Sequence, residues 1–290
     1  MKERAHLFGS SGGLVGVTTE PDGGALPGAP VVLLFNVGLN HRVGPGRLNV
    51  DLARSLAAVG VPSLRFDVSG LGDSEPRGDA GDDVARQVAD LREAMDFAEK
   101  KLGVHRFVPV GLCSGTDGVH GAAMADPRVA GAAFLDGYAY ATPGYRFRAS
   151  MLRLGRLRDP VRWKFALRRR WRRLRGLSTG EEVEIGAPEP IFDRSYPPVE
   201  RFRSDLEALL ARNVKLLFVY TAEAWFFNHR EQFRRMVGWR TLPPAVEVEY
   251  WREADHVFRT LAQRRRAVQR VTSWVRDALV EAPARRAGAA

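Results

Sequence analysis

Cysteine is almost absent from this 290-residue chain: Cys113 is the only one, which excludes an intramolecular disulfide. Such scarcity is typical of proteins in a reducing compartment, so we expect a cytoplasmic location. No apolar run approaches the roughly 18 to 20 residues that span a bilayer, and no transmembrane segment is expected. Zinc motifs, phosphate-binding P-loops and internal repeats are also absent, so the sequence predicts neither a metal site nor a cofactor.

Acidic residues are nearly missing from one window of the sequence. Residues 146–175 contain twelve arginines and Lys164 against a single acid, Asp159, which gives this window a net charge of +12 in a chain whose formal net charge is +10. Charge concentrated in this way indicates a local cationic face rather than a uniformly basic protein. Nucleic acid is a disfavoured partner, because no nucleic-acid recognition motif accompanies the charge.

Short apolar runs occur throughout the rest of the chain and predict strands. Residues 6–8 and 14–19 flank a Ser/Gly-rich turn, which is typical of an antiparallel hairpin. Residues 83–102 carry apolar side chains at three- and four-residue steps, as in an amphipathic helix. Mainly apolar runs that are typical of buried parallel strands occupy residues 31–35, 61–66, 106–110, 129–135, 214–220 and 246–251.

The alternation of strands and helices is interrupted between Tyr138 and Asn213, where the pattern indicates helix and loop only. The expected class is α/β, with a mostly parallel central sheet flanked by helices. We expect its core to consist of residues 1–137 and 214–282. A basic helical cap is then inserted at residues 138–213, and residues 283–290 form a disordered tail.

The sequence Gly111-Leu112-Cys113-Ser114-Gly115 follows one of the predicted strands. A glycine two residues before and two residues after a nucleophile is typical of a very sharp turn between a strand and a helix. Glycine is needed at both places because a Cβ would clash in so tight a turn, and the middle residue projects alone. Cys113 is therefore a candidate nucleophile, with a buried structural cysteine as the alternative.

This turn and the order of the elements around it resemble the α/β-hydrolase superfamily over the whole chain apart from the tail. The resemblance implies the α/β-hydrolase fold with an inserted helical cap. The cysteine turn is similar to that of certain bacterial α/β hydrolases and of the cysteine-dependent aminoacyl shuttle enzymes of nonribosomal peptide pathways. It implies catalysis through a covalent acyl-cysteine intermediate.

The superfamily orders its catalytic residues as nucleophile, acid and histidine. Of the six histidines, His256 is the one that lies in the loop after the last predicted strand, where the superfamily has its base. The acid is either Asp136, directly at the end of a strand, or Glu223, in the loop after the next strand. We favour Asp136, because Glu223 shares its loop with bulky aromatic residues. Asp255 is adjacent to His256 and is interpreted as a residue that stabilises the loop.

An acyl-transfer site also needs two backbone N–H groups for the developing oxyanion. The resemblance implies the N–H of Ser114 and one from the loop after the first parallel strand, for which Gly38 is the candidate. Arg42 and Arg47 lie close by in the sequence and are candidate ligands for a substrate carboxylate or phosphate. The alternative is that these arginines tie the loop to the core.

Three functions remain open from the sequence. The first is cleavage of an ester or thioester through acyl-Cys113, with water as acceptor. The second is a carrier-protein-dependent (amino)acyl transferase that moves a thioester-bound acyl group. The third is a non-catalytic binding module. For the basic cap, the candidate partners are an acidic carrier protein, the phosphate of a phosphopantetheine or of a coenzyme A thioester, or an anionic membrane surface. The alternative is a solvated helix face.

Overall fold

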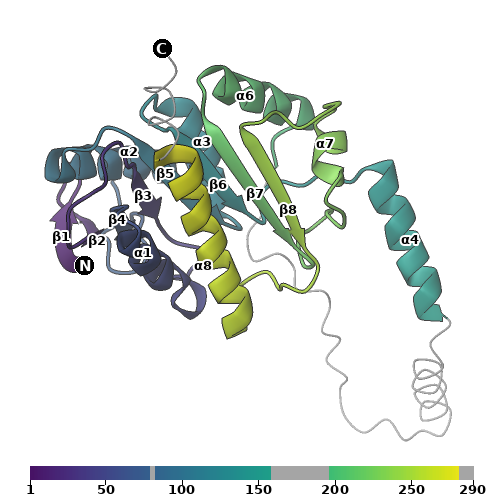
Figure 1. The fold of residues 1–290 in the computed structure, drawn as a ribbon, viewed down its shortest axis with the longest axis horizontal. Helices are drawn as coiled ribbons and strands as arrows, with labels where there is room; N and C mark the ends of the chain where they lie inside the picture. The colour runs from purple at the N-terminus through teal and green to yellow at the C-terminus, as the bar shows by residue number, and fades with distance from the viewer. Residues whose placement is uncertain (79–81, 158–195, 281–290) are drawn as a thin grey trace, which may run out of the picture.

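The computed structural model describes residues 1–78, 82–157 and 196–280. These residues form an eight-stranded sheet with the strand order β1-β2-β4-β3-β5-β6-β7-β8 (Figure 1). β2 pairs antiparallel with β1 and β4, and all other neighbours pair parallel. The strands are β1 (Lys2–Phe8), β2 (Leu14–Glu20), β3 (Val31–Leu34), β4 (Ser63–Phe66), β5 (Phe107–Leu112), β6 (Gly131–Leu135), β7 (Lys215–Thr221) and β8 (Val246–Trp251).

The parallel strands follow from the apolar runs in the sequence. Every residue of β3, β5 and β6 is buried, as expected where helices cover both faces of a sheet. The hairpin of β1 and β2 forms one edge, and most of β1 is exposed. Because parallel strands end at the same edge of a sheet, the residues that follow β5, β6, β7 and β8 are brought close together.

Helices cover the sheet from both sides, which confirms the expected architecture (Figure 1). α1 and α8 pack against one face, where Leu52 and Val271 belong to one buried cluster. α2, α3 and α6 pack against the other face, where Leu91 and Val119 belong to a second cluster. The helices are α1 (Leu48–Ala58), α2 (Asp83–Leu102), α3 (Gly115–Ala125), α4 (Pro143–Leu157), α6 (Val199–Ala211), α7 (Gln232–Met236) and α8 (Leu261–Val275), with a 3-10 helix at Pro45–Arg47 and a π-helical turn at Arg276–Val280.

The predicted boundary of the cap requires a correction at α6. This helix lies within residues 138–213, yet its apolar side chains Phe202, Leu206 and Leu209 are fully buried in the core. The Arg212 guanidinium at its end donates to the backbone oxygen of Ala123 in α3, at 2.7 Å. The spacing of the three apolar residues directs them to one side of the helix, so α6 covers the sheet as part of the core.

α4 is the described beginning of the predicted cap, and in Figure 1 it extends away from the sheet. Residues 158–195 lie outside the described residues, and they include most of the arginine-rich window. The predicted tail at residues 283–290 also lies outside them.

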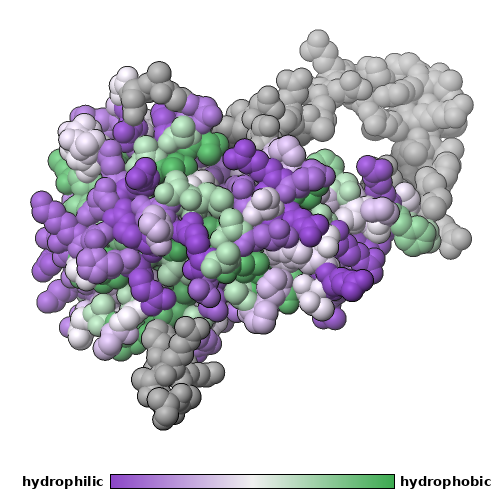
Figure 2. All heavy atoms as spheres, turned by 90° about the horizontal axis from the view of Figure 1, so that it is seen from above, coloured by the Kyte–Doolittle hydropathy of each residue, from purple (hydrophilic) through white to green (hydrophobic). Residues whose placement is uncertain are grey.

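Hydrophilic side chains cover much of the described surface in the view of Figure 2, with apolar side chains between them. No described helix combines the length and the apolar character that crossing a membrane requires. Large apolar side chains that remain exposed include Leu39, Phe147, Trp225 and Phe226. Leu39 follows β3, Phe147 lies in α4, and the other two follow β7, so these residues belong to segments beyond the carboxyl edge of the sheet.

Candidate active site

Cys113 occupies the turn between β5 and α3. Its backbone is in the left-handed region, with φ of 55°, which an L-residue adopts rarely. Its N–H donates to the carbonyl of Leu135 in β6 at 2.9 Å, and the Thr116 hydroxyl donates to its carbonyl at 2.6 Å. These bonds hold the turn between two strands and the helix, and the half-buried Cys113 side chain is carried at its tip.

The two glycines of the turn are required by close backbone contacts. A Cβ on Gly111 would lie 2.5 Å from the carbonyl oxygen of Gly115, and a Cβ on Gly115 would lie 3.1 Å from the carbonyl oxygen of Asn36. The first contact is far too short and the second is tight. The steric reason inferred from the spacing of the sequence is thus found in the structure.

His256 lies in the loop after β8 and meets Asp136 from the end of β6. Its Nδ1–H donates to Asp136 Oδ2 at 2.8 Å, with the proton assigned to Nδ1 because the partner is a carboxylate. Asp136 is almost fully buried, and it also accepts bonds from the Thr221 N–H and hydroxyl, each at 2.6 Å. Three donors therefore fix the orientation of this carboxylate, and the carboxylate fixes the imidazole ring.

The electrostatics of the imidazole favour its charged form. Hydrogen bonds to Asp136 and to Cys113 raise the pKa of His256 to about 10, against the opposing effect of burial. The ring is thus bonded to the carboxylate on one side and to the thiol on the other. At neutral pH it carries a proton, and its positive charge favours the thiolate of Cys113.

The competing acid and the neighbouring aspartate have other partners. Glu223 accepts a hydrogen bond from the backbone N–H of His256 at 3.0 Å, so it contacts the loop rather than the ring. Asp255 accepts from the backbone N–H groups of Val257 and Arg259, at 3.2 and 3.1 Å. Both carboxylates stabilise the loop that carries His256, which for Asp255 is the role inferred from the sequence.

The two predicted oxyanion donors differ in what they contact. The Gly38 N–H donates to the Ser114 hydroxyl at 3.1 Å, so this predicted donor is already bonded to a side chain of the same site. No described residue accepts a bond from the Ser114 N–H. The prediction for Gly38 needs this correction because the rotamer of Ser114, which turns its hydroxyl toward the loop after β3, has no signature in the sequence.

Arg42 is not available to a substrate. Its guanidinium forms ion pairs with Asp67 and with Asp73, and its N–H donates to Asp67 at 2.6 Å. Asp67 is fully buried and needs these donors, so the alternative interpretation of Arg42, as a tie between loop and core, is the correct one. Arg47 is exposed at the start of α1, with φ of 70°, and has no ion pair among the described residues.

No protein-family model matches the sequence, and no curated protein matches it. Solved structures do. An alpha-beta serine hydrolase homologue from Coxiella burnetii is 17% identical with a TM-score of 0.53, over 93% of this chain and 98% of that chain. A predicted CIB-like hydrolase from Thermoplasma acidophilum is 12% identical with a TM-score of 0.56, over 96% of this chain and 99% of that chain. Alpha/beta hydrolase domain-containing protein 10 from mouse is 14% identical with a TM-score of 0.53, over 94% of this chain and 98% of that chain.

The chain has the α/β-hydrolase fold. At these identities the likeness establishes the fold and leaves the chemistry to the residues of this chain. The Coxiella protein is described as a serine hydrolase homologue, whereas the turn of this chain carries Cys113. The α/β-hydrolase fold thus presents a thiol, an imidazole and a buried carboxylate from the carboxyl ends of β5, β8 and β6.

Thr221 is the residue of this site that the sequence analysis missed. It ends β7, the strand between β6 and β8, and it donates twice to Asp136. A hydroxyl residue at the end of the strand next to a candidate acid is the signal that indicates such a partner. The pairing of Thr221 with Asp136 can be predicted only when the order of the strands is known, because β6 and β7 are neighbours in the sheet.

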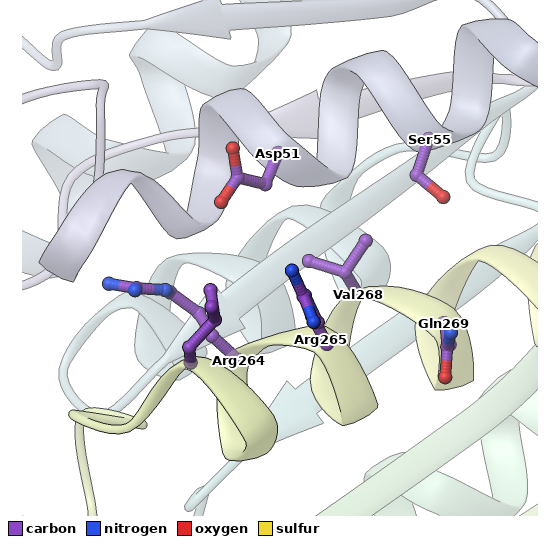
Figure 3. Close-up of a pocket in the computed structure, with 7 residues that line it drawn as sticks. Asp51, Ser55, Arg264, Arg265, Val268 and Gln269 are labelled. Atoms are coloured by element: carbon purple, nitrogen blue, oxygen red, sulfur yellow. The ribbon is translucent and has the colours of Figure 1, made fainter.

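Apart from Cys113, His256 and Asp136, the described residues form a groove on another side of the sheet but no candidate metal site. No group of three or more His, Cys, Asp or Glu side chains there is arranged to hold a metal ion. A groove of about 470 Å³ lies between α1 and α8, where Arg265 and Val268 point toward α1 (Figure 3). Cys113, His256 and Asp136 do not line it.

The first prediction concerns the glycines of the turn. Gly111→Ala should lower the free energy of unfolding by about 1–3 kcal/mol, the usual effect of overpacking, because the new Cβ meets backbone atoms that cannot rotate away. Gly115→Ala should have a smaller effect, given its longer contact. Denaturant unfolding measures both, and Gly23→Ala is the control, because no atom lies within 4 Å of its new Cβ. Equal stability of Gly111→Ala and the control would contradict the close contact.

The second prediction concerns pH. Because the pKa of His256 is raised to about 10, the ring stays protonated through the neutral range and loses its charge as the pH rises through that value. Iodoacetamide should therefore alkylate Cys113 rapidly at pH 7, where only a few per cent of a free thiol with a pKa of about 8.5 is ionised. His256→Ala should move the midpoint of the rate profile up toward 8.5. Identical profiles for the two proteins would contradict the thiol–imidazole pair.

Proposed function

We propose that this protein is an acyl-transfer enzyme that cleaves esters or thioesters through a covalent acyl-Cys113 intermediate. Cys113 is the nucleophile, His256 the general acid and base, and Asp136 the residue that orients His256. The supporting observation is the continuous line of hydrogen bonds from the buried Asp136 carboxylate through the imidazole to the thiol. A cysteine with a purely structural role does not require an imidazole and a buried carboxylate bonded to each other and to its thiol.

In the first half of the reaction the Cys113 thiolate attacks the acyl carbonyl, and a C–S bond forms while electrons move onto the carbonyl oxygen. The Ser114 N–H at the start of α3 is the candidate donor to that oxygen. When the tetrahedral intermediate collapses, the bond to the leaving alcohol or thiol breaks, and the leaving group takes a proton from the His256 imidazolium. The products are acyl-Cys113, neutral His256 and the free alcohol or thiol.

In the second half neutral His256 accepts a proton from the acceptor as that acceptor attacks the acyl-Cys113 carbonyl. The C–S bond breaks, and Cys113 leaves as a thiolate beside the renewed imidazolium. Water as acceptor makes the protein a hydrolase. A thiol as acceptor makes it a transferase, and a thiol nucleophile suits this reaction because exchange between thioesters is nearly isoenergetic.

The cationic window at residues 146–175 supports a large or charged acyl donor for the transferase alternative, either an acidic carrier protein or a coenzyme A thioester. A non-catalytic binding module is the remaining alternative. It gives no reason for a histidine to be bonded to both a buried carboxylate and the only thiol of the chain. A cytoplasmic location, as expected from the scarcity of cysteine, would suit these thioester donors.

Intact-protein mass spectrometry tests the covalent step directly. Incubation with a panel of acyl thioesters and activated esters should add the mass of one acyl group to the wild type and none to Cys113→Ala. His256→Ala should acylate slowly. Loss of the adduct in buffer alone indicates hydrolysis, and loss that requires an added thiol indicates transfer. Acylation that persists in Cys113→Ala, or no acylation with any donor, would contradict the proposal.

The third prediction separates the two candidate acids. Asp136→Asn should lower kcat by a factor on the order of 10⁴, as the loss of a triad carboxylate does elsewhere, because the amide no longer stabilises the imidazolium. Glu223→Gln should have a small effect, because its amide oxygen still accepts the bond from the His256 backbone. Thermal melting controls for misfolding. A severe loss in Glu223→Gln with a mild one in Asp136→Asn would reverse the assignment.

A further inference from the structure

A small pocket outside the triad gathers three basic side chains from three segments. Arg148 comes from α4, His229 from the loop after β7, and Arg235 from α7, and together they line a pocket of about 40 Å³. A buried water needs roughly 10–15 Å³ on the same measure, so the pocket has room for about three waters or one small anion. We call these three residues the basic pocket.

Neither arginine of the basic pocket forms an ion pair with a described residue. In the described part of the chain neither Arg148 nor Arg235 forms an ion pair, although many other arginines of this protein do. Arg148 donates from Nε to the Asn228 side chain at 2.8 Å, which orients its guanidinium. Burial, and then the charge of Arg235, lower the pKa of Arg148. Two cations that line one pocket and have no ion pair of their own favour an anion between them.

Glu231 also lines the pocket, but it is directed to other partners. Its carboxylate forms ion pairs with Arg230 at 3.8 Å and with Arg234 at 3.5 Å. Its backbone N–H donates to His229 Nδ1 at 3.1 Å. That bond makes Nδ1 the acceptor and places the proton of the neutral ring on Nε2. Burial and the charges of the neighbouring arginines lower the pKa of His229, in agreement with a neutral ring.

The N-terminus of α4 supplies further donors. The backbone N–H of Arg146 bonds to the Thr142 carbonyl and that of Tyr145 to the Thr142 hydroxyl. The N–H of Gly144, which also lines the pocket, has no acceptor within the helix because of its place in the first turn. The positive end of the helix dipole therefore adds to the two guanidinium groups.

The basic pocket is connected to the triad through two elements. The loop after β7 carries Glu223, which binds the His256 backbone, and five residues later Asn228, which binds Arg148. Tyr250 of β8 packs on Phe227 with ring centroids 5.9 Å apart. Burial raises the pKa of Tyr250, and among the charges around it Arg252 lowers this pKa, Asp136 raises it and Arg148 lowers it.

We propose that the basic pocket, formed by Arg148, His229, Arg235 and the N-terminus of α4, binds a phosphate group of the acyl donor. Two guanidinium groups, an imidazole N–H and a helix N-terminus provide more donors than the two oxygens of a carboxylate use, and they suit the several oxygens of a phosphate. The attachment of this phosphate to an acyl thioester rests on the acyl-transfer function proposed above. A phosphopantetheine thioester has this chemistry, either on a carrier protein or within coenzyme A.

The test compares two donors that differ in one group. S-acetyl phosphopantetheine and S-acetyl pantetheine are given to the wild type, and kcat/KM for acylation of Cys113 is measured by intact mass. We expect Arg148→Gln/Arg235→Gln to lower kcat/KM about 100-fold for the phosphorylated donor, tenfold for each charged hydrogen bond removed. The donor without phosphate should react at an unchanged rate. Equal rates of the two donors with the wild type, or equal losses in the variant, would overturn the proposal.

A matched control removes the same charge elsewhere. Arg240→Gln/Arg265→Gln alters two exposed arginines that lie outside the cationic window and do not line the pocket. It should leave both donors within about twofold of the wild type, since exposed charges act weakly through solvent. If this control lost as much activity with the phosphorylated donor as the pocket variant does, general attraction would replace a specific site as the explanation.

Calorimetry with unacylated phosphopantetheine separates the two proposals. Binding that is lost in the pocket variant, in a protein that acylates with no donor, would support the pocket and refute the acyl-transfer function. Acylation of Cys113 at the same rate by donors with and without phosphate would support the acyl-transfer function and refute the phosphate site. Acetyl-coenzyme A and an acetylated carrier protein distinguish the sources of the phosphate. Of these two donors, the natural source of the phosphate is the one with the higher kcat/KM, provided that this kcat/KM falls in the Arg148→Gln/Arg235→Gln variant.

Discussion

The buried carboxylate of Asp136 is the group on which the site depends. A charge without partners in the interior is strongly unfavourable, so Asp136 is compatible with the fold only while its donors remain in place. Those donors are Thr221 at the end of β7 and His256 in the loop after β8. The order of β6, β7 and β8 in the sheet, and the position of the last loop, are therefore tied to the chemistry of one side chain.

A second constraint acts on the backbone of Cys113, the proposed nucleophile. Left-handed backbone at Cys113 is costly for an L-residue, and the turn is retained because Gly111 lets the chain reverse without a clash. Asp136 also has positive φ, of 49°, so Cys113 and Asp136 are both held in unusual backbone conformations. Such conformations persist where the surrounding structure determines them, here through bonds to neighbouring strands. The thiol is thereby fixed relative to a rigid sheet.

The sequence singled out residues that the structure brings together where a local pattern marks them, and it failed where a contact depends on partners distant in the chain. Cys113 and His256 were identifiable because a glycine-flanked turn and a loop after the last strand are visible as patterns. Asp136 was favoured for its place directly after a strand. The role of Arg42 depends on a buried aspartate in another loop. The availability of Gly38 depends on a rotamer of Ser114. Neither of these contacts produces a local pattern in the sequence.

The arginine-rich window shows the same distinction within one helix. Its first two arginines, Arg146 and Arg148, lie two residues apart in α4, and a count of charges treats them alike. Arg146 is exposed, whereas Arg148 is partly buried and bonded to Asn228 near an arginine of α7. A solvated helix face accounts for the first but not for the second. Charge in this window is therefore partly organised by the core, at the same edge of the sheet as the triad. That placement puts Arg148 at the edge of the sheet that also carries Cys113, His256 and Asp136.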